Sequence, residues 1–133
     1  MPLIKDFNKY LLGVEMSDKH HRNLIDIVND LYDSLLKGAK KEIIAHYLKR
    51  IRVYTLAHFQ AEELFMLEIG YPDLINHKII HKEFVDKVGE FILKNETSPI
   101  GKELVTYLVT WLMKHILETD KKYVDFMNEN KKD

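Results

Sequence analysis

Histidines and carboxylates interrupt the apolar pattern of this chain at helical spacing. In the segment 40–69, apolar residues recur in steps of three and four, and the same stripe passes through His58 and Glu62. The next stripe passes through His77 and His81. Positions four apart on an α-helix differ by only about 40° in direction, so the members of each pair point the same way. Imidazoles and carboxylates grouped in this way predict a metal site.

Three further polar side chains lie in or beside the remaining stripes. His21 precedes Leu24 by three positions and therefore shares its face. His115 continues the apolar stripe of the last segment, and Asp120 lies five residues beyond it. Positions five apart differ by roughly 140° on an ideal helix. Both side chains therefore point inward only if they flank the stripe or if a bulge distorts the helix.

The number of these residues favours metal binding over a purely structural role. A single core histidine is more often bonded to a backbone carbonyl, and polar pairs four apart also stabilise exposed helices. However, five of the seven histidines and two carboxylates would have to enter one core, where unpaired polar groups are costly. A metal site between facing helices requires such a set. Imidazole suits zinc, copper, iron and nickel, and seven side chains exceed what one tetrahedral zinc needs, which suggests two metals sharing carboxylates.

The composition describes a globular protein of one domain. The chain has 133 residues, of which 46% are hydrophobic and 31% charged, with a formal net charge of −1. The near-zero charge gives no case for a nucleic-acid partner, and no apolar run is long enough for a membrane span. The absence of cysteine excludes disulfides and thiolate ligands. The first residues lack the pattern of a signal peptide, so we expect a cytoplasmic protein.

Only 5 glycines and 3 prolines punctuate the chain, which favours long helices over many short strands. We expect the first helix to begin with Ser17 as N-cap and to end at Gly38, and the second to stop at Gly70-Tyr71-Pro72. The fourth should begin with Ser98 as N-cap and Pro99 at its first position.

Four helices with short connections predict an all-α fold, an up-down-up-down antiparallel four-helix bundle. The expected organisation is a short N-terminal arm over 1–16 packed on the bundle, the bundle itself over 17–128, and a polar tail over 129–133.

The chain resembles the hemerythrins, and among them the single-domain bacteriohemerythrins, from Phe7 to about Phe126. Four motifs in the family's order carry the resemblance: Gly13-Val-Glu-Met-Ser-Asp-Lys-His-His21, His58-Phe-Gln-Ala-Glu62-Glu63, His77-Lys-Ile-Ile-His81 and Trp111-Leu-Met-Lys-His115-Ile-Leu-Glu-Thr-Asp120. The family's spacing to the following leucine selects His21 over His20 in the first motif.

The resemblance implies reversible O2 binding at a non-haem di-iron centre and no enzymatic activity. It implies that two Fe ions, joined by an oxo or hydroxo bridge, leave one coordination position open for O2 on the iron with two histidines. A redox protein or an O2-consuming protein is a possible partner. The implied ligands are His77, His81 and His115 on one iron, His21 and His58 on the other, and Glu62 and Asp120 bridging both.

The resemblance also implies an apolar O2 pocket, whose members are equally explicable as ordinary bundle core. The expected lining residues are Leu24, Phe59, Trp111, Leu112 and Ile116. The spare histidines His20 and His46, together with Glu63 and Glu68, are expected to be surface residues.

Other functions remain open at this point. A ferritin-like di-iron oxidase would use Glu-x-x-His repeats, and this sequence has none. A sensor of O2, NO or iron would usually carry an output domain, for which 133 residues leave no room, although signalling by contact with a partner stays possible. A zinc or purely structural metal site is the remaining alternative.

Overall fold

The computed structural model describes Ile4 and residues 11–130. These residues form helices joined by short connections, and none of them lies in a strand. The helices are α1 (Glu15–Leu36), α2 (Lys41–Glu68), α3 (Leu74–Lys94), α4 (Gly101–Lys114), the π-helical segment η2 (His115–Asp120) and α5 (Lys121–Glu129).

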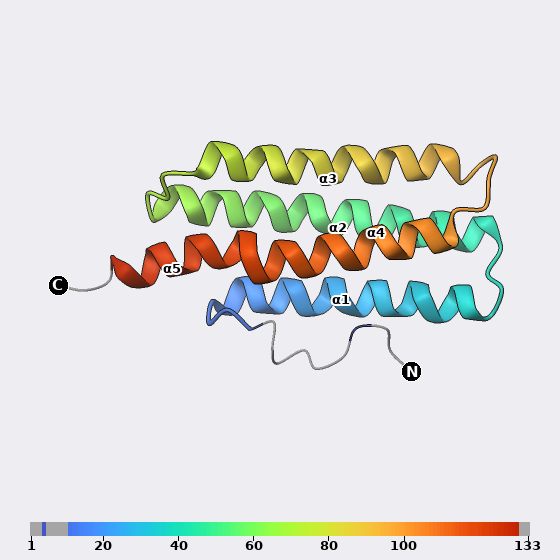
Figure 1. Cartoon of the computed structure of the whole chain (residues 1–133), viewed down its shortest axis with the longest axis horizontal. Coiled ribbons are helices and arrows are strands. Elements are labelled where there is room, and N and C mark those ends of the chain that lie inside the picture. The colour runs from blue at the N-terminus through green and yellow to red at the C-terminus, as the bar shows by residue number, and fades with distance from the viewer. Residues whose placement is uncertain (1–3, 5–10, 131–133) are drawn as a thin grey trace.

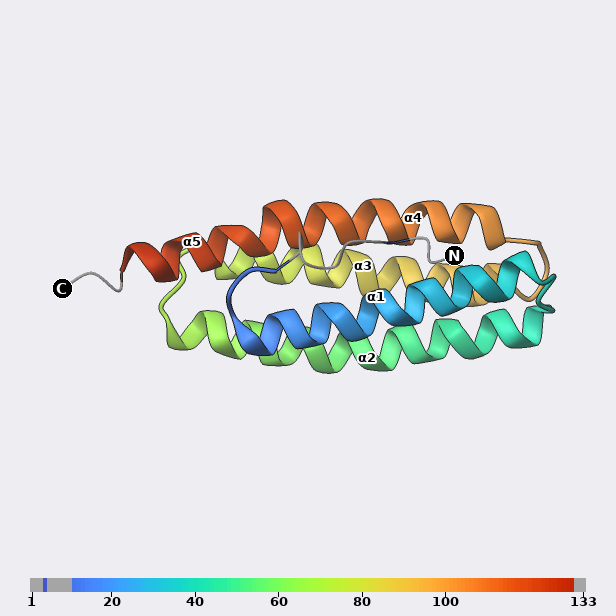
Figure 2. The ribbon, with the colours of Figure 1, turned by 90° about the horizontal axis from the view of Figure 1, so that it is seen from below.

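The segments α4, η2 and α5 follow one another without a break and make the fourth rod of a bundle. Figures 1 and 2 show the rods lying side by side, with the chain reversing direction at each connection. Helix α2 contacts both α1 and α3, and α1 also contacts α4. The predicted all-α, up-down-up-down antiparallel four-helix bundle is therefore confirmed.

Glycines with positive φ end the first two helices as the sequence predicts. Gly38 has φ +78° two residues after the end of α1, and Gly70 has φ +71° two residues after the end of α2. This left-handed conformation suits glycine because a Cβ would clash with the backbone. The chain turns back at both places, which sets α1 against α2 and α2 against α3.

The predicted N-caps of the first and fourth helices are wrong. Helix α1 begins at Glu15 after Val14, and Ser17 is a buried residue whose Oγ hydrogen-bonds the Tyr123 hydroxyl. Helix α4 begins at Gly101 after Ile100, which is only 1% exposed. The amide of Ser98 donates to the carbonyl of Lys94 and so belongs to the turn that closes α3.

The core runs the length of the bundle and includes one residue that precedes the first helix in the sequence. Ile4 packs in this core, and its amide and carbonyl both bond the side chain of Asn29 on α1, at 2.7 and 3.0 Å. The rest of 1–10 and the last three residues, including Phe7 and much of the expected arm and tail, lie outside the described residues.

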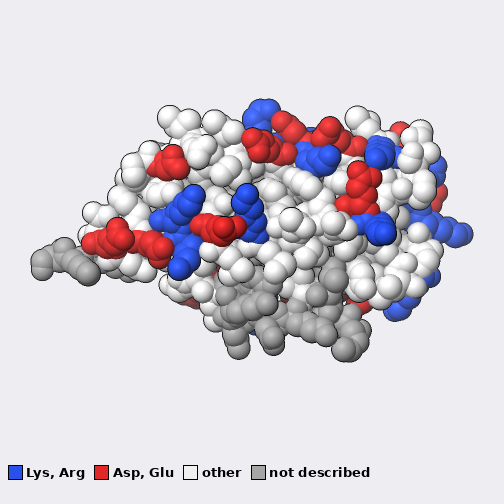
Figure 3. Space-filling view, in the orientation of Figure 1, with Lys and Arg blue, Asp and Glu red and all other residues white. Residues whose placement is uncertain are grey.

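The surface carries charges of both signs. In Figure 3 lysines and arginines alternate with aspartates and glutamates over the face shown, without a large patch of one sign. Within the described part of the chain, no helix is long and apolar enough to cross a membrane.

Candidate metal centre

The π-helical segment resolves the five-residue spacing in the last motif. His115 begins η2 and Asp120 ends it. A π-helix closes its hydrogen bonds five residues apart and therefore brings i and i+5 to the same face. Both side chains are buried and point into the bundle, so the bulge is the alternative that the structure adopts.

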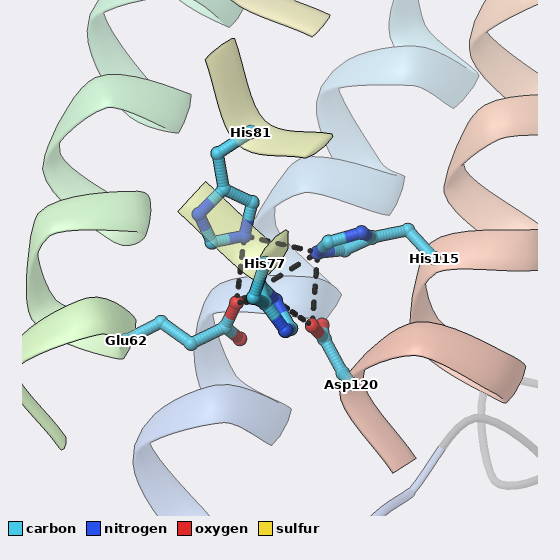
Figure 4. A group of neighbouring side chains, drawn as sticks. All are labelled: Glu62, His77, His81, His115 and Asp120. Carbon is cyan, nitrogen blue, oxygen red and sulfur yellow. Dashed lines mark hydrogen bonds and ion pairs between the residues drawn. The ribbon is translucent and has the colours of Figure 1, made fainter. Parts of the chain in front are cut away.

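Three imidazoles gather around one oxygen of Glu62. The Nε2 atoms of His77 and His81 lie 3.1 and 2.9 Å from Glu62 Oε1, and Nε2 of His115 lies 3.7 Å from the same oxygen. Asp120 Oδ1 lies 3.0 Å from Nε2 of His77 and 2.9 Å from Nε2 of His115. Figure 4 shows these five side chains converging from α2, α3 and the fourth rod. We call His77, His81 and His115 the three-histidine group.

Two imidazoles face the other oxygens of the same carboxylates. The Nε2 atoms of His58 and His21 lie 3.5 and 4.0 Å from Glu62 Oε2, and Nε2 of His21 lies 2.9 Å from Asp120 Oδ2. We call His21 and His58 the two-histidine group. Each carboxylate thus presents one oxygen to each group, which is the arrangement that two bridging carboxylates would take.

Buried polar atoms without hydrogen-bond partners show that the cluster fits metal ions. Both oxygens of Asp120 and the Nε2 atoms of His21 and His58 are buried and lack a partner of hydrogen-bond geometry, although their neighbours lie close. Buried polar groups without partners are costly unless they ligate a metal. The donor atoms form two sets of candidate ligands, one around each group, that share Glu62 and Asp120.

Opposing charges shift the pKa values within the cluster. Burial raises the pKa of Glu62, but the adjacent imidazoles of His115, His77 and His81 outweigh it and hold that pKa well below its usual value. Burial also opposes ionisation of Asp120, whose pKa is nevertheless lowered by His115 and His21. Burial lowers the pKa of His58 to about 4. The pKa of His115 is raised to about 9, because Asp120 and Glu62 outweigh the effect of burial.

These shifts predict that the free energy of unfolding of the metal-free protein peaks near pH 6.5, the ordinary histidine pKa. Below pH 6.5, His58 is protonated in the unfolded chain but stays neutral in the folded protein down to about pH 4. The free energy of unfolding therefore falls as the pH falls through this range. Above pH 6.5, His115 loses its proton in the unfolded chain but keeps it in the folded protein up to about pH 9. The free energy of unfolding therefore falls as the pH rises through this range.

Denaturant unfolding of chelator-treated protein over this pH range measures the effect. Glu62 and Asp120, with lowered pKa values, lose their contribution only in stronger acid. A stability that keeps rising above pH 6.5 would contradict the pKa assigned to His115.

Three residues around the cluster were not predicted from the sequence. The fully buried Tyr123 donates a hydrogen bond to Glu62 Oε2 at 3.1 Å. Glu63 and His20, expected at the surface, instead contact His81 and His58 of the cluster, both at 2.8 Å. His46 and Glu68 are exposed as expected.

A match to a family model identifies the family to which this chain belongs. The model described as hemerythrin HHE cation binding domain matches residues 12–127, nearly the whole described chain. This chain is a member of the hemerythrin family. Members bind a di-iron centre, and hemerythrins and bacteriohemerythrins are oxygen-binding proteins rather than enzymes.

Curated hemerythrins cover most of the chain. A bacteriohemerythrin of Clostridium acetobutylicum is 34% identical over 125 residues, which are 89% of this chain and 96% of that protein. A bacteriohemerythrin of Pseudomonas aeruginosa is 33% identical and covers 85% of this chain and 74% of its own. Myohemerythrin-1 of Phascolopsis gouldii is 32% identical over 80% of this chain and 88% of its own.

Solved hemerythrin structures have the same fold. A wild-type hemerythrin superposes with a TM-score of 0.83 at 26% identity, covering 92% of this chain and 95% of its own. A leucine-to-tyrosine variant of hemerythrin superposes with a TM-score of 0.86 at 25% identity, covering 96% and 98%.

Two of the residues expected to line an O2 pocket contact imidazoles of the cluster. Phe59 stacks on His81 with ring centroids 3.8 Å apart, and Trp111 stacks on His115 at 4.3 Å. A narrow apolar void beside Trp111 is too small to admit a water molecule. The void is lined by Leu24, Val28, Phe84, Leu108, Trp111 and Leu112. Phe59 and Ile116, which were also expected to line the pocket, are buried but are not among the residues that line this void.

Proposed function

We propose that this chain binds O2 reversibly at a non-haem di-iron centre and serves as an oxygen carrier, store or local supplier. The observation that carries the proposal is that each carboxylate faces both histidine groups. Oε1 of Glu62 and Oδ1 of Asp120 face the three-histidine group, and the other oxygen of each carboxylate faces the two-histidine group. Two metal ions sharing two bridging carboxylates would occupy such a cluster.

The proposed ligands follow from these two groups. His77, His81 and His115 would hold one iron, His21 and His58 the other, and Glu62 and Asp120 would bridge them. The ion with two histidines then has fewer protein ligands, which makes it the place for O2. When bound as ferrous ions, the metals supply the electrons that reversible O2 binding needs.

The chain's own residues would keep water away from this place. Leu24, Phe59, Leu112 and Ile116 are each at most 4% exposed, and Trp111 is half-buried. The void beside Leu24, Trp111 and Leu112 has apolar walls. A hydrophobic shell controls solvent access to a metal site, and exclusion of water favours release of O2 over irreversible oxidation of the metal.

The test is to expose anaerobic, diferrous protein to air and then to remove the oxygen. We expect a stable visible absorption to appear with O2 and to disappear when O2 is removed, over repeated cycles. Rapid, irreversible oxidation without such a band would contradict the proposal.

This experiment and a pull-down separate the alternative functions. A ferritin-like oxidase would turn over O2 without a stable oxygenated form. A sensor would bind O2 but would also change its set of bound proteins on oxygenation, which a pull-down with and without O2 measures. A redox or O2-consuming partner and a cytoplasmic location complete the proposal.

A further inference from the structure

Two of the five inward imidazoles have a second partner on the nitrogen that points away from the cluster. Nδ1 of His81 lies 2.8 Å from Oε2 of Glu63, and Nδ1 of His58 lies 2.8 Å from Nδ1 of His20. His81 belongs to the three-histidine group and His58 to the two-histidine group. One outer partner therefore stands behind each proposed metal position.

The direction of these hydrogen bonds follows from the chemistry of a metal-bound imidazole. A neutral imidazole that binds a metal through Nε2 carries its proton on Nδ1 and donates from there. Glu63 accepts this proton from His81 with a carboxylate oxygen. His20 accepts a hydrogen bond from His58 only if its own Nδ1 carries no proton, so the proton of a neutral His20 must be on Nε2.

The surroundings leave Glu63 to His81 and hold His20 in place. Among the residues that the structure describes, Glu63 forms no salt bridge with a lysine or arginine, so its charge is directed at His81. His20 lies edge-on to Tyr54, with ring centroids 6.1 Å apart, and the Tyr54 hydroxyl accepts a hydrogen bond from Asn23 at 2.8 Å. Both contacts join α1 to α2 beside the cluster.

The two acceptors differ in charge. Glu63 is a carboxylate whose side chain is 24% exposed, whereas His20 is a half-buried imidazole. A carboxylate acceptor draws on the imidazole proton more strongly and makes the ring a more basic ligand. The outer hydrogen bonds thus distinguish two metal positions that share the same carboxylates.

Resting on the proposed di-iron function, we propose that Glu63 and His20 are positioning residues that increase the difference between the two metal sites beyond their unequal number of histidines. Glu63 strengthens His81 as a ligand and so tightens the three-histidine site. His20 orients the ring of His58 without adding charge and leaves the two-histidine site the weaker and more open one, where O2 would bind.

The test is an anaerobic titration of metal-free protein with ferrous ions that resolves the two binding steps. Glu63→Ala removes both the acceptor and the charge, and we expect it to weaken one step by about 10–100-fold, the usual effect of losing such an outer partner. Glu63→Gln keeps an acceptor oxygen without the charge and should weaken the same step by less. His20→Ala should weaken the other step, and His20→Gln should restore most of it.

Ligand variants assign the steps. Glu63 variants should weaken the step that His115→Ala removes, and His20 variants the step that His21→Ala removes. Glu68→Gln and His46→Gln are the controls for loss of a carboxylate and of an imidazole, since both residues are exposed on α2 and contact no proposed ligand.

The outcomes separate this inference from the proposed function. If wild-type protein takes up two ferrous ions and the Glu63 and His20 variants keep both binding constants, the inference is overturned and the di-iron function stands. If Glu63→Gln matches wild type while Glu63→Ala is weakened, the hydrogen bond acts without the charge, and the proposed inequality is overturned. Wild-type protein that binds fewer than two ions would overturn the di-iron function itself.

Discussion

Glu62→Ala is expected to reduce the metal content from two ions per chain to at most one. Glu62 is fully buried and its two oxygens face all five inward imidazoles, so its removal breaks both proposed metal positions at once. The change also removes the hydrogen bond that the buried Tyr123 hydroxyl donates to this carboxylate, which costs about 1–3 kcal/mol of stability. Metal analysis together with denaturant unfolding measures both effects.

Two further variants make this result interpretable. Glu62→Gln keeps the volume and an oxygen that accepts from Tyr123, so it should fold like wild type and still lose metal. Glu68→Ala removes an exposed carboxylate from the same helix and should change neither quantity. A Glu62→Ala protein that retains two ions would show that Glu62 does not bridge them.

Leu112→Asp is expected to speed the autoxidation of the oxygenated protein by about tenfold or more, which corresponds to ~1.4 kcal/mol in the barrier. Leu112 is 4% exposed and lines the apolar void beside the stacked rings of Trp111 and His115. A carboxylate there would draw water toward the metals. The decay of the O2-dependent absorption over time measures the rate.

Leu117→Asp is the matched control, because Leu117 lies on the same rod but is 38% exposed. It should leave autoxidation unchanged. If Leu112→Asp unfolds the protein, Leu112→Asn introduces a polar group without charge and should act in the same direction. An unchanged rate in a folded Leu112 variant would remove this residue from the O2 pocket.

Much of the cluster could be predicted from spacing within single helices. A regular helix fixes the relative direction of residues four apart, so His58 with Glu62 and His77 with His81 were predicted to share a face, and they do. The spacing of His115 and Asp120 left two possibilities open, since periodicity alone does not reveal a π-helical segment. The structure decides between them through η2.

Contacts that depend on how neighbouring helices are turned could not be predicted in this way. Glu63 and His20 lie at the edges of the buried faces of α2 and α1, where a side chain meets either solvent or the next helix. The start of α4 was missed for a similar reason: burial of Ile100 in the core, rather than the capping preference of Ser98, determines where that helix begins.

Metal analysis of protein produced with adequate iron tests the central claim most directly. The arrangement of Glu62 and Asp120 between two groups of histidines predicts about two irons per chain. One zinc ion per chain, or no metal at all, would contradict it.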